Sequence, residues 1–320
     1  MKTEFITAIS NPRTSWSKAL GRTGKTSLEF DHEIAVTRAD TGVRIEAIDT
    51  SGSRTAILIP VKASSGIRPI LLGGDRHALL IGISRYAVKP GLPDLDSASL
   101  DVRDLAEALQ KHAGFKRENI RLLVDDGARH AQLRNALRNF TARPGPDDLL
   151  IIYFVGYGLH DPSDHERIYL AAYDTQLRQL SETALGLEEV RSVIAGSARS
   201  RQALLLFDVA RELQGEWNFG GNNLVNAYLL RLFSGDPTKA VMVASGLGEL
   251  GRDAMGGHGL FTKHLVEAAT GKADWNQDGL VTVEEWFQQV ARAVRAESQG
   301  KQSPKYVLRA SERLIFAGNK

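Results

Sequence analysis

The densest pattern of possible ligands in this chain runs from Asp274 to Glu285 and reads DWNQDGLVTVEE. Oxygen donors recur at alternate positions, and Gly279 stands where a calcium loop turns sharply. Ca²⁺ prefers such oxygen ligands, and EF-hand loops supply them at these spacings. The sequence therefore predicts one calcium site with these ligands: Asp274, Asn276, Asp278, Leu280 through its backbone carbonyl, Thr282 directly or through water, and Glu285 as a bidentate carboxylate.

Gly271 should end the helix that enters this loop, and EEWFQQVARAVR should form the helix that leaves it. A single site of this kind is expected to make the fold rigid rather than to act as a sensor. The alternative is an acidic loop that stabilises its own turns without a metal.

Two apolar runs point to a second site. Residues Leu149–Phe154 are unbroken in their hydrophobicity and stop at Gly156-Tyr157-Gly158, and RQALLLFDVAR, from Arg201 to Arg211, has the same form. Such runs are typical of strands buried on both faces of a parallel sheet. Open α/β sheets usually place their chemistry at the carboxyl edge of the strands, where both runs end.

Together the two runs resemble the caspase-like cysteine peptidases, in particular the bacterial and metacaspase-type members. In that family the first strand ends in Gly-His-Gly, whose His is the general base, and the second ends in Asp-x-Cys, whose Cys is the nucleophile. The matching positions here are Tyr157 and Ala210. The resemblance extends from about Arg76 to about Gly318, through the segments GISRY, GHGLFTKHLVEAATGKAD and QSPKY.

The resemblance therefore implies a peptidase scaffold without its catalytic pair. Alanine has no nucleophilic atom, and a phenol, with an unperturbed pKa of about 10, is mostly protonated at neutral pH. The chain also contains no cysteine, which excludes disulfides and thiolate chemistry. We expect a pseudo-peptidase that acts by binding; whether it is an enzyme at all is left open.

The alternative is an active, Arg- or Lys-directed endopeptidase with a rewired nucleophile. His160, Ser163 and His165 lie in the loop that follows Tyr157 and would be the first substitutes to consider. Gly257-His258-Gly259 imitates the catalytic signature, but it precedes a helix instead of ending a buried strand.

Two acidic residues extend the resemblance to a substrate pocket. In metacaspase-type members one carboxylate just before the nucleophile and one at the start of the first long helix receive a Lys or Arg side chain; the matching residues are Asp208 and Asp101. Carboxylates hold a guanidinium through charge-assisted hydrogen bonds, with or without a nucleophile. The alternatives are that Asp101 only complements a helix dipole and that Arg211 neutralises Asp208.

Strand-like and helix-like segments alternate from His77 onward, which predicts β-α-β units. The expected fold is a caspase-like three-layer α/β/α domain over residues 76–320, with a mostly parallel sheet of about six strands. Residues 1–75 should form an irregular arm to about residue 26 and then a small β-rich segment. ALGRTGKT, from Ala19 to Thr26, matches a phosphate-binding loop only loosely and is interpreted as a chance match.

Composition narrows the classes of partner. With 24% charged residues and a net charge of +2, nothing favours nucleic acid binding. No signal peptide or membrane-length apolar run is present, which predicts a cytoplasmic protein without membrane contact. The expected partner is a protein or peptide, such as an active caspase-like homologue; a structural subunit of a bacterial defence complex is the alternative.

Overall fold

The computed structural model describes most of the chain. The described residues are 4–11, 14–20, 42–48, 54–60, 74–89, 91–197, 200, 202–209, 224–233, 239–246, 249, 251, 257–275, 277, 279–308 and 315–318. The chain divides into two compact units, Met1–Ile70 with Trp275–Asp278 and Leu71–Asp274 with Gly279–Lys320. In the ranges just given, no helix is both long enough and apolar enough to cross a membrane.

The first unit contains an antiparallel sheet with the strand order β2-β1-β3-β4. An irregular arm before residue 26 was therefore the wrong expectation for two segments, which form β1 and β2 and pair in register. The sequences of these two strands are polar and show little periodicity, so they were not predicted. β1 also pairs with β3, about forty residues away, and such distant pairing leaves no local signal in the sequence. The strands are β1 (Glu4–Asn11), β2 (Thr14–Leu20), β3 (Gly42–Ile48) and β4 (Arg54–Pro60).

Some predictions for this unit lie outside the described residues. They concern the segment from Ser27 to Arg38, expected as a strand, and the larger part of ALGRTGKT, from Gly21 to Thr26.

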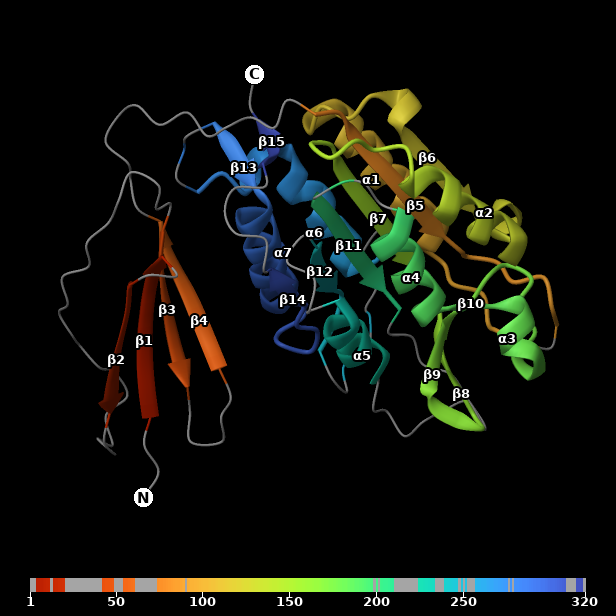
Figure 1. The fold of residues 1–320 in the computed structure, drawn as a ribbon, viewed down its shortest axis with the longest axis horizontal. Coiled ribbons are helices and arrows are strands. Elements are labelled where there is room, and N and C mark those ends of the chain that lie inside the picture. The colour runs from red at the N-terminus through yellow and green to blue at the C-terminus, as the bar shows by residue number, and fades with distance from the viewer. Residues whose placement is uncertain are drawn as a thin grey trace. The chain divides into compact units, whose positions relative to one another are not determined.

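The second unit is built on a six-stranded sheet with the order β14-β12-β11-β7-β5-β6 (Figure 1). Every strand pair is parallel except β12 with β14, which confirms the predicted mostly parallel sheet. Its strands are β5 (Arg76–Gly82), β6 (Ile120–Val124), β7 (Leu149–Val155), β11 (Gln202–Asp208), β12 (Lys239–Val243) and β14 (Lys305–Leu308).

Three short strands form a separate antiparallel sheet beside the large one. The first half of the segment RIYLAAYD, which was expected to continue the β-α-β alternation, belongs instead to this small sheet as the end of β9, which pairs with β8 and β10. The tight turn between β8 and β9 allows antiparallel pairing without a crossover helix. The strands are β8 (Gly158–Asp161), β9 (Asp164–Leu170) and β10 (Leu185–Gly186); β13 (Leu280–Thr282) pairs separately with β15 (Ile315–Gly318).

Helices cover both faces of the large sheet and give the three layers that were predicted (Figure 1). In β11, Leu204 and Leu206 belong to one core cluster and Leu205 to the other, as the two-residue period of a strand requires. One face packs against α1 (Ala98–His112), α6 (Leu260–Glu267) and α7 (Val283–Glu297). The other packs against α2 (His130–Thr141), α4 (Leu187–Ser197) and α5 (Leu224–Phe233); α3 (Leu180–Thr183) is a single turn.

Two large polar side chains in the α1–α6–α7 layer form hydrogen bonds inside it. The hydroxyl groups of Tyr153 and Thr262 lie 2.7 Å apart, and the indole N–H of Trp286 donates to the carbonyl of Leu265 at 3.1 Å. Buried polar groups destabilise a core unless they are paired, so these bonds allow large side chains to fill this layer.

Gly82, the last residue of β5, allows α1 to approach the sheet closely. A Cβ atom there would press against the backbone carbonyl of Ala98 and would lie 2.7 Å from Cγ2 of Val102. The first turn of α1 is thereby held directly over the carboxyl end of β5.

We expect Gly82→Ala to lower the free energy of unfolding by about 1–3 kcal/mol, the usual range for overpacking, because the added methyl group meets backbone atoms that cannot rotate away. Urea denaturation followed by circular dichroism measures the change. Gly127→Ala is the control, since a Cβ atom at Gly127 has nothing within 4 Å. Equal stability of the two variants would contradict this close packing.

Candidate functional site

The two loops that the sequence singled out leave the same edge of the sheet side by side. In the register of β7 and β11, Val155 lies opposite Asp208. The pairing continues beyond the strands, because the N–H of Gly156 donates to the carbonyl of Asp208 at 3.1 Å and that of Gly158 to Val209 at 3.4 Å. Ala210 follows directly and lies outside the described residues.

Tyr157 is a core side chain rather than a residue lining an open cleft. Only 2% of it is exposed, and it belongs to the cluster under α2, α4 and α5. Its ring centroid lies 5.5 Å from that of Tyr86, and its carbonyl accepts the N–H of Ala171 at 2.9 Å. The position that the resemblance assigns to a general base is therefore filled by an aromatic ring that packs the fold.

Two of the possible substitutes, His160 and Ser163, lie in β8 and in the turn that follows it. His160 is buried in β8. The Ser163 hydroxyl donates to Oδ1 of Asp161 at 2.6 Å, and this bond, with a second from the Ser163 backbone, lowers the pKa of the Asp161 carboxyl. The side chain of His165 lies outside the described residues. The Asp161 carboxyl that accepts this bond is a weaker base than a free carboxylate, because its pKa is lowered, so it is poorly suited to activate the hydroxyl as a nucleophile.

Asp101 and Asp208 do converge, although β11 and α1 contribute them from distant parts of the sequence. Asp208 follows the same alternation as Leu204 and Leu206 and so faces the α1–α6 side of the sheet. The point where a Cβ atom of Gly259 would stand is 2.8 Å from Oδ2 of Asp101 and 3.5 Å from Oδ2 of Asp208. Gly259 thus lies between the two carboxylates, and a side chain there would separate or displace them.

Both carboxylates are buried, with Asp101 0% and Asp208 1% exposed. Gly259 is the N-cap of α6, and its N–H donates to Oδ1 and Oδ2 of Asp101 at 3.0 and 3.2 Å. Because the N-terminal end of a helix carries a partial positive charge, this arrangement stabilises the ionised form of a carboxylate.

His258 also lies close to Asp101. Its Nδ1 lies 3.7 Å from Oδ1 of Asp101 and 3.3 Å from Oδ2 of Asp104, which stands one turn further along α1. The sequence contains a signal for the contact between Gly259 and Asp101, because a glycine-rich segment that leads into an apolar helix is a common anion-binding arrangement. The likeness of Gly257-His258-Gly259 to the catalytic signature concealed its position at the start of α6.

The residues predicted for the site therefore occupy two layers. Tyr157 packs in the cluster under α2, α4 and α5, and the carboxylates face α1 and α6. Asp101 does stand in the first turn of its helix, as one alternative proposed, but the N-terminus that holds it belongs to a different helix. Arg211, the expected neutralising partner of Asp208, lies outside the described residues.

The acidic loop near the carboxyl end adopts two features of a calcium loop. Gly271 has a φ of +97° and interrupts the helical turn Ala268–Lys272 that extends α6, as predicted. Oδ2 of Asp274 accepts the N–H of Gly279 at 3.0 Å, and the φ of +81° at Gly279 makes the sharp turn that such loops need. Asn276 and Asp278 lie outside the described residues.

The end of the same loop caps α7. The hydroxyl of Thr282 accepts the N–H of Glu285 at 3.1 Å, and Oε2 of Glu285 accepts the N–H of Thr282 at 2.8 Å, which together form a capping box. Among the described residues no group of three or more His, Cys, Asp or Glu could hold a metal. Asp274, Leu280, Thr282 and Glu285 are nevertheless in sequence positions from which they would supply oxygen ligands.

Comparison with known proteins shows what this architecture is similar to. A family model described as the caspase domain matches residues 75–315. A protein of Phaeodactylum tricornutum named Metacaspase III c is 34% identical over 104 residues, 31% of this chain and 30% of that protein. This chain thus matches less than a third of that relative's length.

A solved structure of a Geobacter sulfurreducens protein superimposes with a TM-score of 0.52 and 15% identity, over 77% of this chain and 100% of that one. At such an identity the likeness concerns the fold alone.

We expect Asp101→Ala to lower the free energy of unfolding by about 1–3 kcal/mol, because it leaves the buried N–H of Gly259 without its acceptor. Chemical denaturation at neutral pH measures this change. Asp104→Ala is the matched control on the same helix; its side chain is 39% exposed, and its loss should cost no more than about 1 kcal/mol. If Asp101→Ala instead stabilised the protein, the buried carboxylate would be maintained for binding rather than for the fold.

Proposed function

This chain belongs to the caspase domain family, whose model matches residues 75–315, and we propose that it is a catalytically inactive member that acts by binding a protein or peptide. One observation carries the proposal: the 320 residues include no cysteine. The peptidases of this family attack with a cysteine thiolate, and the matching position here, Ala210, offers a methyl group.

The environment of Tyr157 supports the same conclusion. A general base must reach the proton that it removes, either directly or through one water molecule. Tyr157 is 2% exposed and packs against Tyr86, so its hydroxyl does not stand in an open site. The exchange at the base position therefore serves packing, and restoring a thiol alone would not restore the chemistry.

Binding would use the two carboxylates of the predicted substrate pocket. Asp101 and Asp208 approach the same point beside Gly259, and two ionised carboxylates form a strong site for a guanidinium or ammonium group. The ligand would be an exposed Arg or Lys side chain of a peptide or of a protein such as an active caspase-like homologue. To reach them it would have to move the His258–Gly259 segment, whose N–H now bonds Asp101.

A second candidate is a purely structural subunit. The burial of Asp101 and Asp208 favours it, because the chain's own Gly259 and His258 already occupy the place of a basic ligand. The two candidates differ in whether a basic side chain can displace this segment.

We also propose one calcium site in the Asp274–Glu285 loop. Ca²⁺ would supply positive charge that lets several carboxylates share a short loop, and it would fix the start of α7. Support comes from the Asp274–Gly279 turn and from Glu285, which is held beside Thr282. In the absence of the ion, the capping box would keep Glu285 close to its ligand position.

We expect the native protein to bind an Arg-containing peptide without cleaving it, with calcium present. Binding is measured by fluorescence anisotropy and cleavage by release of a fluorophore from Arg and Lys substrates. Asp208→Asn should weaken binding about tenfold or more, since it removes a charge-assisted contact. A210C should gain no turnover, because it supplies a thiol without a base.

Asp94→Asn is the charge-matched control for this test, because Asp94 pairs with Arg85 and Lys89 outside the proposed pocket. Cleavage by the native chain would refute inactivity and reveal a rewired hydrolase. Absence of binding would reject the pocket and leave the structural subunit.

For calcium, we expect isothermal titration to detect one site and Glu285→Gln to abolish the heat, since it removes the ligand expected to bind through two oxygens. Glu284→Gln is the control, because this neighbouring carboxylate is not among the predicted ligands. No heat from the native protein at millimolar calcium would eliminate the site.

A further inference from the structure

A cavity of about 580 Å³ lies where the end of α7 meets the start of β14. Its wall includes Arg292, Arg295, Gln299, Ser303, Pro304 and Lys305, and none of its lining residues belongs to the candidate site or to the acidic loop. The volume is within the range of small-molecule sites, roughly 300–1,000 Å³. The proposals above make no use of this cavity.

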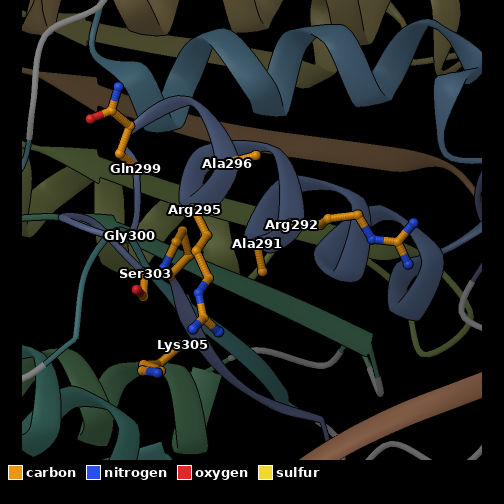
Figure 2. Close-up of a pocket in the computed structure, with 9 residues that line it drawn as sticks. Ala291, Arg292, Arg295, Ala296, Gln299, Gly300, Ser303 and Lys305 are labelled. Atoms are coloured by element: carbon orange, nitrogen blue, oxygen red, sulfur yellow. The ribbon is translucent and has the colours of Figure 1, made fainter.

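Positive charge gathers on its wall. Figure 2 shows the Arg295 guanidinium extending from α7 toward the segment that carries Ser303 and Lys305, whereas Arg292 points in another direction. Arg295 and Lys305 are exposed, and no lining residue is acidic. Within the ranges that the structure describes, neither cation forms an ion pair.

Glu249 is a candidate for a counter-charge, because its carboxylate and Lys305 both lie beside Gly246, and this carboxylate already accepts two backbone hydrogen bonds. Its Oε2 accepts the N–H of Gly246 at 2.9 Å and that of Ser303 at 2.5 Å, and no ion pair with Lys305 is present in the described chain. The partial negative charge at the end of α7 favours Arg295 in the last turn of this helix, so helix stability alone explains the position of this cation. Lys305 lies on a strand, and this explanation does not extend to it.

The loop that carries the wall is held firmly. Gly300, with a φ of +78°, donates its N–H to the carbonyl of Arg295 at 2.8 Å and so closes the end of α7. The fully buried Gln302 donates to the carbonyl of Ala244 at 2.9 Å, and the Ser298 hydroxyl donates to the carbonyl of Gln302 at 3.0 Å. The loop that leads to Ser303 and Lys305 is therefore fixed by hydrogen bonds before any ligand arrives, which lowers the cost of ordering this segment on binding.

From this arrangement we propose that the cavity binds a small molecule that carries a phosphate monoester. Arg295 offers the planar fork that fits phosphate oxygens, Lys305 adds a second positive charge, and the Ser303 hydroxyl can donate to a third oxygen. A phosphate dianion has both the charge and the number of acceptors to use all three groups. The volume exceeds that of a phosphate alone, and Ala291, Ala296 and Pro304 provide apolar wall for an organic body.

The test is isothermal titration of the full chain with phenyl phosphate, compared with phenol, benzoate and inorganic phosphate. We expect phenyl phosphate to bind most tightly, phenol not to bind, and added salt to weaken the interaction. Arg295→Gln and Lys305→Gln should each raise the dissociation constant about tenfold or more, because each removes a charge-assisted contact. Arg295→Lys should lie between Arg295→Gln and the native protein, since it keeps the charge and loses the fork.

Lys301→Gln is the matched control, because Lys301 is exposed in the same loop and does not line the cavity. It should change the dissociation constant less than about twofold, as expected for a screened surface charge. Circular dichroism confirms that each variant is folded. An equal loss in Lys301→Gln would indicate diffuse attraction, binding of benzoate as tight as that of phenyl phosphate would indicate a carboxylate site, and no heat with phenyl phosphate would mean no site; each overturns the proposal.

Discussion

The requirement that a buried carboxylate be compensated organises the carboxyl edge of this fold. Asp101 is completely buried, and the Gly259 N–H donates to both of its oxygens. This contact joins α1 to α6, two helices of one layer whose contacting residues are 158 positions apart. Because an uncompensated charge in such a place would be very unfavourable, the position of Gly259 at the start of α6 is strongly constrained.

The groups that stabilise the carboxyl edge of the sheet are not the groups that a cysteine peptidase uses for catalysis. The strands β7 and β11 stay in register through their backbone bonds and their apolar side chains, none of which involves a thiol or an imidazole. An aromatic ring at position 157 adds to one core cluster, and Asp101 is held by a helix N-terminus in the other layer. The caspase-like scaffold is thus stabilised by backbone bonds, by apolar packing and by the Asp101–Gly259 contact, none of which needs a catalytic nucleophile or base.

Much of the large sheet could be predicted from the sequence, for physical reasons. The run Leu149–Phe154 is continuous because β7 is buried on both faces, and the positive-φ residue Gly271 interrupts the helix that enters the acidic loop, where a helix end was expected. The common edge of β7 and β11 also followed, since parallel strands that point the same way must end on the same side.

The predictions failed where distant residues decide the structure. The pairing of β1 with β3, the small sheet of β9 and the bond from Gly259 to Asp101 each depend on partners far along the chain, and no local pattern encodes the distance between them. A glycine-rich segment before an apolar helix does announce an available N-terminus, but it does not say which anion will occupy it. Asp101 was predicted to line a pocket or, alternatively, to complement the dipole of its own helix, and neither interpretation pointed to Gly259. Seen together, the two explain each other, because the N–H at the start of α6 and the carboxylate of Asp101 form one buried contact, and any basic ligand would have to replace this contact.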